Sequence, residues 1–181
     1  MNRVLLLLVL LGCLQEARAH RLDECLQATR VRPGTNHVEL SIEITPGVEV
    51  VREFLAVIDR DGDGAISAKE ESAYAMRLLG ELSATVDEQT VKAELLAVSA
   101  APVARLREGT GVVRIRARAE FAPRPDGRHR LALINRHLPS ISVHLVNAVK
   151  PTDPAVSIRK QTRDEQQTRY QLEFDVRSLR E

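Results

Sequence analysis

The segment Val38-Glu39-Leu40-Ser41-Ile42-Glu43-Ile44 alternates strictly between apolar and polar side chains. Successive side chains of an extended strand point to opposite faces, so this period of two predicts a strand with one face buried and the other in water. The turn-forming run Pro33-Gly34-Thr35-Asn36 precedes it, and the residues before that turn, Glu24–Val31, also suit a strand. The sequence therefore predicts a β-hairpin near the start of the folded region.

The same alternation recurs along the rest of the chain. A long strand with one charged face is predicted at Val113–Phe121, where Arg114, Arg116 and Arg118 stand between apolar residues. The other predicted strands contain Ala84–Val86, Val91–Val98, Leu131 and Leu133, Ile141, Val143 and Leu145, Val156 and Ile158, and finally Tyr170, Leu172, Phe174 and Val176. Many short strands separated by regular turns predict an antiparallel β-sandwich.

One segment between these strands has the period of a helix. Val51, Phe54, Leu55 and Ile58 recur at the spacing of one helix face. A second run of good helix formers follows at residues 68–82, and its apolar residues are Tyr74, Ala75, Leu78, Leu79 and Leu82. The predicted fold is mainly β: an antiparallel β-sandwich-like domain of residues 20–46 and 83–181, carrying one inserted helix–loop–helix at residues 47–82.

The loop of this insert fits the calcium-binding pattern of an EF-hand, Asp59-Arg60-Asp61-Gly62-Asp63-Gly64-Ala65-Ile66-Ser67-Ala68-Lys69-Glu70. Gly64 stands where such a loop turns sharply. The predicted metal ligands are Asp59, Asp61, Asp63, the backbone carbonyl of Ala65, Ser67 directly or through a water, and both carboxylate oxygens of Glu70. Because Ca²⁺ prefers six to eight oxygen ligands, we predict one Ca²⁺ site here, with a solvated acidic turn as the alternative.

The start of the chain has the features of an export signal. Met1-Asn2-Arg3 is a short basic start, Val4–Leu14 is apolar, and Ala17-Arg18-Ala19 is a small-x-small cleavage site. The apolar stretch is too short to span a bilayer as a stable helix. We therefore expect a signal peptide at residues 1–19, a mature chain that begins at His20, and a periplasmic or secreted location.

A second interpretation of this region is a bacterial lipoprotein signal. Leu10-Leu11-Gly12-Cys13 resembles a lipobox, in which Cys13 would carry the lipid. Cleavage there would leave a signal shorter than the roughly 15–30 residues expected, and Leu11 is bulky for its position. We therefore favour cleavage after Ala19.

Composition excludes several classes of function. Lys and Arg number 26 against 25 Asp and Glu, so no charge excess favours nucleic acid or an anionic membrane as partner. Tryptophan is absent and aromatic residues are only 3% of the chain, which leaves no platform for stacking on carbohydrate. Cys25 is the only cysteine after the signal, so we expect no internal disulfide and a thiol that is buried as a small hydrophobic group.

No sequence motif indicates catalysis, because H-E-x-x-H, G-x-S-x-G and P-loop patterns are all missing, and we expect no enzyme. The spacing of His129, His137 and His144 does not suit a zinc site, so roles at the surface or at hairpin ends are expected. An N-terminal His20 can nevertheless chelate Cu(II) or Ni(II) through its amine and imidazole, completed by His137 or His144. The alternative function is thus a transition-metal (Ni, Co or Cu) accessory protein that works with a membrane transporter.

Four segments are similar to one family of exported bacterial proteins: residues 20–29, the loop 59–70, Asn135-Arg136-His137, and residues 146–151. Similar segments precede the membrane domain of some hydrogenase/urease accessory (HupE/UreJ-like) transporter proteins. This chain reaches Glu181 without membrane helices, so the resemblance implies a free-standing periplasmic relative that works beside a membrane protein partner. It implies no catalytic residues.

The chain contains a single loop of the calcium-binding pattern. A lone hand cannot pair with a second one in the same chain, and its apolar stripes are too extensive to stay in contact with water. The stripes could pack on the β-domain of the same chain or pair with the hand of a second molecule. Because the insert is tethered at both ends to predicted strands, we favour packing on the β-domain of its own chain. We therefore expect a monomer.

Overall fold

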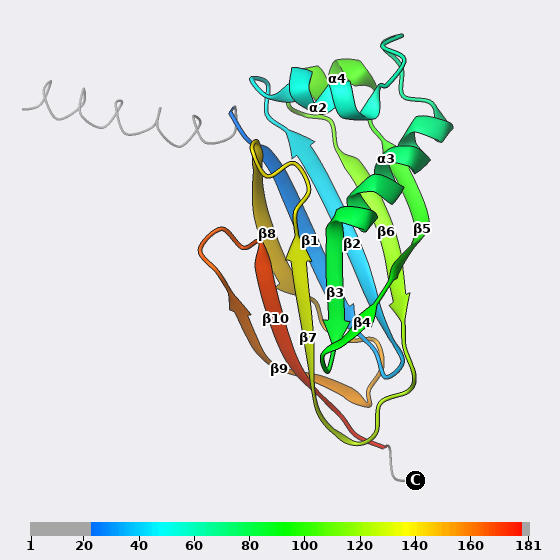
Figure 1. The fold of residues 1–181 in the computed structure, drawn as a ribbon, viewed down its shortest axis with the longest axis vertical. Coiled ribbons are helices and arrows are strands. Elements are labelled where there is room, and N and C mark those ends of the chain that lie inside the picture. Colours follow the sequence, from blue (N-terminus) through cyan, green and yellow to red (C-terminus); the bar gives the residue numbers. More distant parts are fainter. Residues whose placement is uncertain (1–22, 179–181) are drawn as a thin grey trace, which may run out of the picture.

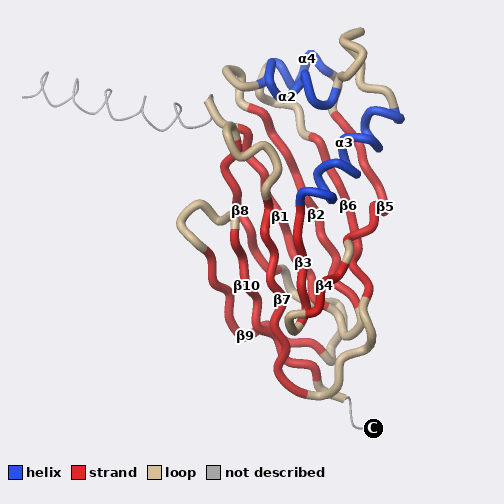
Figure 2. Tube along the Cα trace, viewed as in Figure 1, coloured by secondary structure: helices blue, strands red, loops and turns tan. Residues whose placement is uncertain are grey.

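The computed structural model describes residues 23–178, so the predicted signal peptide, Cys13 and His20 lie outside the described residues. Strands contain 48% and helices 17% of them, which confirms the prediction of a mainly β fold. Two five-stranded sheets lie face to face, consistent with a β-sandwich, and the helices gather at one end and along one side (Figures 1 and 2). The inward-facing residues of both sheets belong to one hydrophobic core.

The first sheet has the strand order β5-β6-β2-β1-β8. Its strands are β1 (Cys25–Pro33), β2 (His37–Pro46), β5 (Ala93–Ala100), β6 (Val113–Glu120) and β8 (Ser142–Ala148). β1 and β2 form the predicted antiparallel hairpin, in which Val31 lies opposite Leu40. β8 runs parallel to β1, so the prediction of purely antiparallel pairing is wrong at this position. The reason is topological, because β8 enters this sheet from the second sheet rather than by a hairpin from β1.

The second sheet has the strand order β4-β3-β7-β10-β9. Its strands are β3 (Leu82–Val86), β4 (Gln89–Val91), β7 (Gly127–Asn135), β9 (Val156–Arg163) and β10 (Arg169–Val176). The predicted strand Val91–Val98 is divided between the two sheets, because the chain leaves β4 at Val91 and enters β5 at Ala93. The prediction of one continuous strand at Val91–Val98 is therefore wrong.

In β8, the set of alternate side chains that faces the core is the opposite of the one predicted. We expected Val143 and Leu145 on the buried face, but His144 and Val146 are buried and Leu145 is 41% exposed. The parallel register sets this phase, since His144 lies beside the buried Gln27 of β1. A buried polar face on β1 therefore continues onto β8.

Two helices lie between β2 and β3, as predicted: α2 (Val51–Ile58) and α3 (Ala68–Glu81). Phe54 and Ile58 are fully buried, and they belong to the same core as the strands. A further helix, α4 (Val103–Arg107), follows β5 and was not predicted. Within residues 23–178, none of the helices is long and apolar enough to cross a membrane.

Candidate metal centre

The predicted calcium loop joins the end of α2 to the start of α3. Asp59 still donates its backbone N–H to the carbonyl of Leu55 at 2.9 Å, so the loop starts directly from the helix. At the other end, Ser67 caps α3 in a capping box with Glu70: the Ser67 side chain accepts from the Glu70 backbone N–H, and the Glu70 side chain accepts from the Ser67 backbone. The Ser-x-x-Glu spacing produces this arrangement, and it turns the Glu70 carboxylate back toward the loop.

Three aspartates of the loop gather their side chains at one place. One carboxylate oxygen from each of Asp59, Asp61 and Asp63 lies within 4.8 Å of those of the other two. Backbone N–H groups later in the loop hold these carboxylates: Gly62 (3.0 Å) and Gly64 (3.2 Å) donate to Asp59, Asp63 (3.2 Å) donates to Asp61, and Ala65 (2.8 Å) donates to Asp63. Asp61 and Asp63 are exposed, so water or an ion can reach them.

The two glycines of the loop make its tight winding possible. Gly62 has φ +72° and Gly64 has φ +82°, which is the left-handed region that other residues adopt only at a cost. These two turns bring alternate side chains, those of Asp59, Asp61 and Asp63, to the same side. The sharp turn predicted at Gly64 is therefore present.

Glu70 lies at the inner side of the loop, where it is only 9% exposed. Its Oε1 atom accepts from the backbone N–H of Arg60 at 2.7 Å, and its Oε2 atom accepts from the backbone N–H and the hydroxyl of Ser67 at 2.9 and 2.8 Å. The hydrogen bonds from Ser67, followed by those from Arg60 and Asp61, lower the pKa of Glu70 to about 2. The carboxylate is therefore charged at neutral pH.

Not all predicted ligands meet at the aspartate group. Glu70 is not part of the group that lies within 4.8 Å, and its oxygens are engaged with the loop backbone and with Ser67. The backbone N–H of Ala65 donates to Asp63. The carbonyl oxygen of Ala65 is the atom predicted to bind the metal. The structure thus brings together Asp59, Asp61 and Asp63.

The donor set suits a hard cation. Its atoms are carboxylate oxygens, to which Ser67 and the Ala65 carbonyl would add further oxygen, and oxygen is what Ca²⁺ and Mg²⁺ take as ligands. Within residues 23–178, no group of three that includes histidine or cysteine has ligand atoms as close as those of the three aspartates. The residues present therefore fit Ca²⁺ better than a soft transition metal.

The three histidines were expected at the surface or at hairpin ends, and His137 does lie just after the end of β7. His129, His137 and His144 are 7%, 0% and 4% exposed, so the expected surface positions are wrong. Their surroundings satisfy them in part: His129 Nδ1 lies 2.8 Å from an oxygen of Asp87, whereas the buried Nδ1 atom of His144 has no hydrogen-bond partner among the described residues. These histidines belong to the interior of the sandwich.

Residues far apart in the sequence form a buried polar cluster around His137, which the sequence analysis missed. The side chain of Gln27 in β1 donates to the His137 carbonyl at 3.0 Å and accepts from the side chain of Asn135 in β7 at 3.0 Å. These bonds join the two sheets directly. Cys25 lies in the same region of β1 and is fully buried, as predicted, and burial raises the pKa of its thiol to about 12.

Comparison of the chain with models of protein families, with curated proteins and with solved structures found no match.

Proposed function

We propose that the loop Asp59–Glu70 is an EF-hand that binds one Ca²⁺ ion. The observation that carries this proposal is the convergence of the Asp59, Asp61 and Asp63 carboxylates in a glycine-turned loop between two helices. Each of these carboxylates is already oriented by a backbone N–H, so little ordering cost remains for ion binding.

The remaining ligands would complete the coordination sphere. Ala65 supplies its carbonyl oxygen, Ser67 its hydroxyl directly or through a water, and Glu70 both carboxylate oxygens. A carboxylate has about four lone-pair sites, so Glu70 can keep hydrogen bonds from the loop while it binds the metal. The charge of the four acidic ligands is offset in part by Arg60 and Lys69 in the same loop.

The role we infer for the ion is structural. Both helices bury their apolar faces in the common core, so the loop closes a connection between elements that are already packed. EF-hands of extracellular modules bind Ca²⁺ at roughly 0.1–1 mM, which suits an exported protein in a calcium-containing medium better than a cytosolic sensor. We assign no enzymatic reaction to the chain.

Titration calorimetry with Ca²⁺, Mg²⁺, Ni²⁺ and Cu²⁺ tests the proposal. We expect one Ca²⁺ per chain, weaker Mg²⁺ binding because Mg²⁺ demands tighter octahedral geometry, and no comparable site for Ni²⁺ or Cu²⁺. Glu70→Gln should weaken Ca²⁺ binding about tenfold or more, a loss of roughly 1.4 kcal/mol per decade. The matched control is Glu53→Gln, which removes one carboxylate from the exposed side of α2 and should change the affinity by less than about twofold.

Two results would contradict the proposal. One is the absence of Ca²⁺ binding at millimolar concentration. The other is a Glu70→Gln variant that binds Ca²⁺ as tightly as the parent protein. Tight stoichiometric Ni²⁺ or Cu²⁺ binding that is unaffected by Glu70→Gln would instead favour the transition-metal accessory function.

A further inference from the structure

The outer face of the first sheet carries ordered rows of charged side chains across β1, β2 and β6. This is the charged face predicted for the strand Val113–Phe121, and its arginines point to solvent as expected. Antiparallel register places Arg32, Glu39 and Arg118 in one row, Arg30, Ser41 and Arg116 in the next, and Ala28, Glu43 and Arg114 in the third. The face therefore presents five arginines against two glutamates over these rows.

Two glutamates of this face, Glu39 and Glu43, each contact two arginines. Glu43 is 3.3 Å from Arg30 of the middle row and 3.6 Å from Arg114. Glu39 is 3.0 Å from Arg32 and 2.7 Å from Arg118. The hydrogen bond from Arg118 is the main cause that lowers the pKa of Glu39. In the row of Glu39 the strands form an arginine–carboxylate–arginine arrangement, in which the carboxylate accepts charge-assisted hydrogen bonds from both sides.

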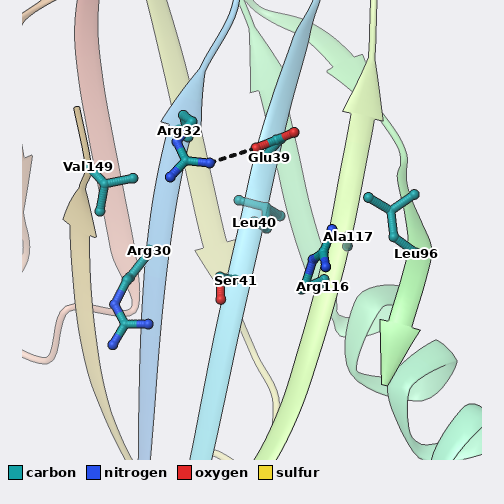
Figure 3. A pocket seen from close by; sticks show the side chains of 9 residues that line it. All are labelled: Arg30, Arg32, Glu39, Leu40, Ser41, Leu96, Arg116, Ala117 and Val149. Carbon is teal, nitrogen blue, oxygen red and sulfur yellow. Dashed lines mark hydrogen bonds and ion pairs between the residues drawn. The ribbon is translucent and has the colours of Figure 1, made fainter. Parts of the chain in front are cut away.

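The middle row has the two arginines but no carboxylate. Ser41 stands between Arg30 and Arg116 at the place where Glu39 stands in the row above (Figure 3). Its short side chain leaves a hollow of about 270 Å³, which both arginines line. Arg30 forms an ion pair with Glu43 at 3.3 Å, whereas Arg116 forms no ion pair within the described part of the chain.

Further groups around the hollow indicate the kind of ligand. Arg32 also lines it, and the buried Nε–H of Arg32 has no acceptor among residues 23–178. Two apolar side chains complete the wall, Val149 beyond β1 and Leu96 on β5, and Leu96 is 51% exposed (Figure 3). Glu39 lines the hollow as well, and its two carboxylate oxygens are paired with Arg32 and Arg118. The hollow therefore combines the positive charge of Arg116 with an apolar edge, and its volume lies below the roughly 300–1,000 Å³ of sites for larger ligands.

We propose that this hollow binds the carboxylate of a small organic acid. The carboxylate takes the place above Ser41 that a glutamate occupies in the neighbouring rows, between the guanidinium groups of Arg30 and Arg116. The Ser41 hydroxyl donates a further hydrogen bond, and a short aliphatic chain lies against Leu96 or Val149. Inorganic phosphate shares the charge of this ligand but lacks the apolar part, so it should bind more weakly.

The experiment follows arginine side-chain and backbone NMR signals of the calcium-loaded protein during titration with butyrate and, separately, with inorganic phosphate. We expect butyrate to shift the signals of Ser41 and Arg116 at millimolar concentration. Arg116→Gln should weaken butyrate binding about tenfold or more, because it removes a charged donor. Ser41→Glu should abolish binding, since it places the missing carboxylate in the hollow.

The matched control is Arg114→Gln, which removes the same charge from the same strand but does not line the hollow. We expect its butyrate affinity to stay within about twofold of the parent protein at moderate salt. Equal weakening by Arg114→Gln and Arg116→Gln would show that only the overall charge matters and would overturn the proposal. Tighter binding of phosphate than of butyrate would overturn the assignment of the ligand. Arg116→Gln decides the test alone if Ser41→Glu fails to fold.

Discussion

The Nδ1 atom of His137 lies 2.6 Å from the Oε2 atom of Glu81, the last residue of α3. The other ring nitrogen, Nε2, lies 3.0 Å from the hydroxyl of Tyr74, also in α3. Burial lowers the pKa of His137, against the raising effect of Glu81, so the ring is neutral at pH 7. Burial also raises the pKa of Tyr74 well above its ordinary value. His137 therefore donates from Nδ1 to Glu81 and accepts from Tyr74, which anchors α3 to the loop after β7.

This arrangement predicts that the protein loses stability in mild acid. The pKa of His137 is depressed in the folded state, and burial together with the nearby His137 depresses that of His144. The unfolded chain therefore binds more protons as the pH falls below about 6.5, the ordinary value for histidine, and unfolding becomes easier. We expect the unfolding free energy from urea titration, in the presence of a calcium chelator, to be lower at pH 5.5 than at pH 7.5.

A variant separates the two histidines. The Nδ1 atom of His144 is buried without a hydrogen-bond partner among the described residues, so His144→Leu removes both an unsatisfied polar atom and a titrating group. The difference in unfolding free energy between pH 7.5 and 5.5 should become smaller in this variant and should not vanish, because His137 remains. A free energy in the parent protein that is constant or rises toward pH 5.5 would contradict the prediction.

A second contact attaches α3 to the edge of the first sheet. The Oε1 atom of Glu71 accepts the backbone N–H of Ala100 in β5 at 2.6 Å. Glu71→Ala leaves this N–H without its acceptor, so we expect a loss of about 1–3 kcal/mol in the unfolding free energy. Glu71→Gln keeps a side-chain oxygen in place and should cost clearly less. Equal losses in the two variants, measured by urea denaturation, would show that the contact does not act through this hydrogen bond.

Calcium should raise the melting temperature if the loop binds it. A ligand that binds only the native state at a hundredfold excess over Kd adds about 2.7 kcal/mol, and for a chain of this size that corresponds to roughly 5–10 °C. Differential scanning calorimetry with and without Ca²⁺ measures the shift. Glu70→Gln should lose most of it, and Mg²⁺ should give a smaller shift than Ca²⁺. An unchanged melting temperature at every Ca²⁺ concentration would rule out a site with a structural role.

Local patterns account for the parts of the fold that the sequence predicted correctly. The hairpin of β1 and β2 follows from an alternation that matches a half-buried strand, and the loop at Asp59–Glu70 follows from ligand spacing within one continuous segment. The spacing of the predicted ligands can be seen within one stretch of twelve residues, Asp59–Glu70. For that reason the gathering of the three aspartates could be predicted before the structure was known.

The errors arise where distant parts of the chain decide the outcome. His144 rather than Val143 faces inward because β8 lies parallel to β1, and no local pattern specifies that register. The contacts of His137 with Glu81 and Tyr74 join residues 56 and 63 positions apart in the sequence. Pairing over such distances cannot be derived from one sequence, which is why the buried polar cluster was missed. α4 escaped prediction because a helix of five residues is too short to show a periodic pattern.

The packing of α2 and α3 bears on the oligomeric state that we expect for the protein. Phe54 of α2 is fully buried, and its ring packs edge-on against Tyr74 of α3 with a centroid distance of 5.5 Å. Leu78 and Leu79 of α3 also lie in the core of the same chain. The apolar faces that a second EF-hand would need are therefore already occupied, which favours a monomer.

We expect the calcium-loaded protein to sediment as a monomer at micromolar concentration, with no change when calcium is removed. Phe54→Ala should lower the unfolding free energy by about 3–5 kcal/mol, because it leaves a cavity, yet the folded fraction should still sediment as a monomer. Met76→Ala is the control on α3, since Met76 is 61% exposed, and it should change stability by about 0.5 kcal/mol or less. A dimer that forms only with calcium and disappears in Phe54→Ala would show that the hand opens and pairs between two molecules.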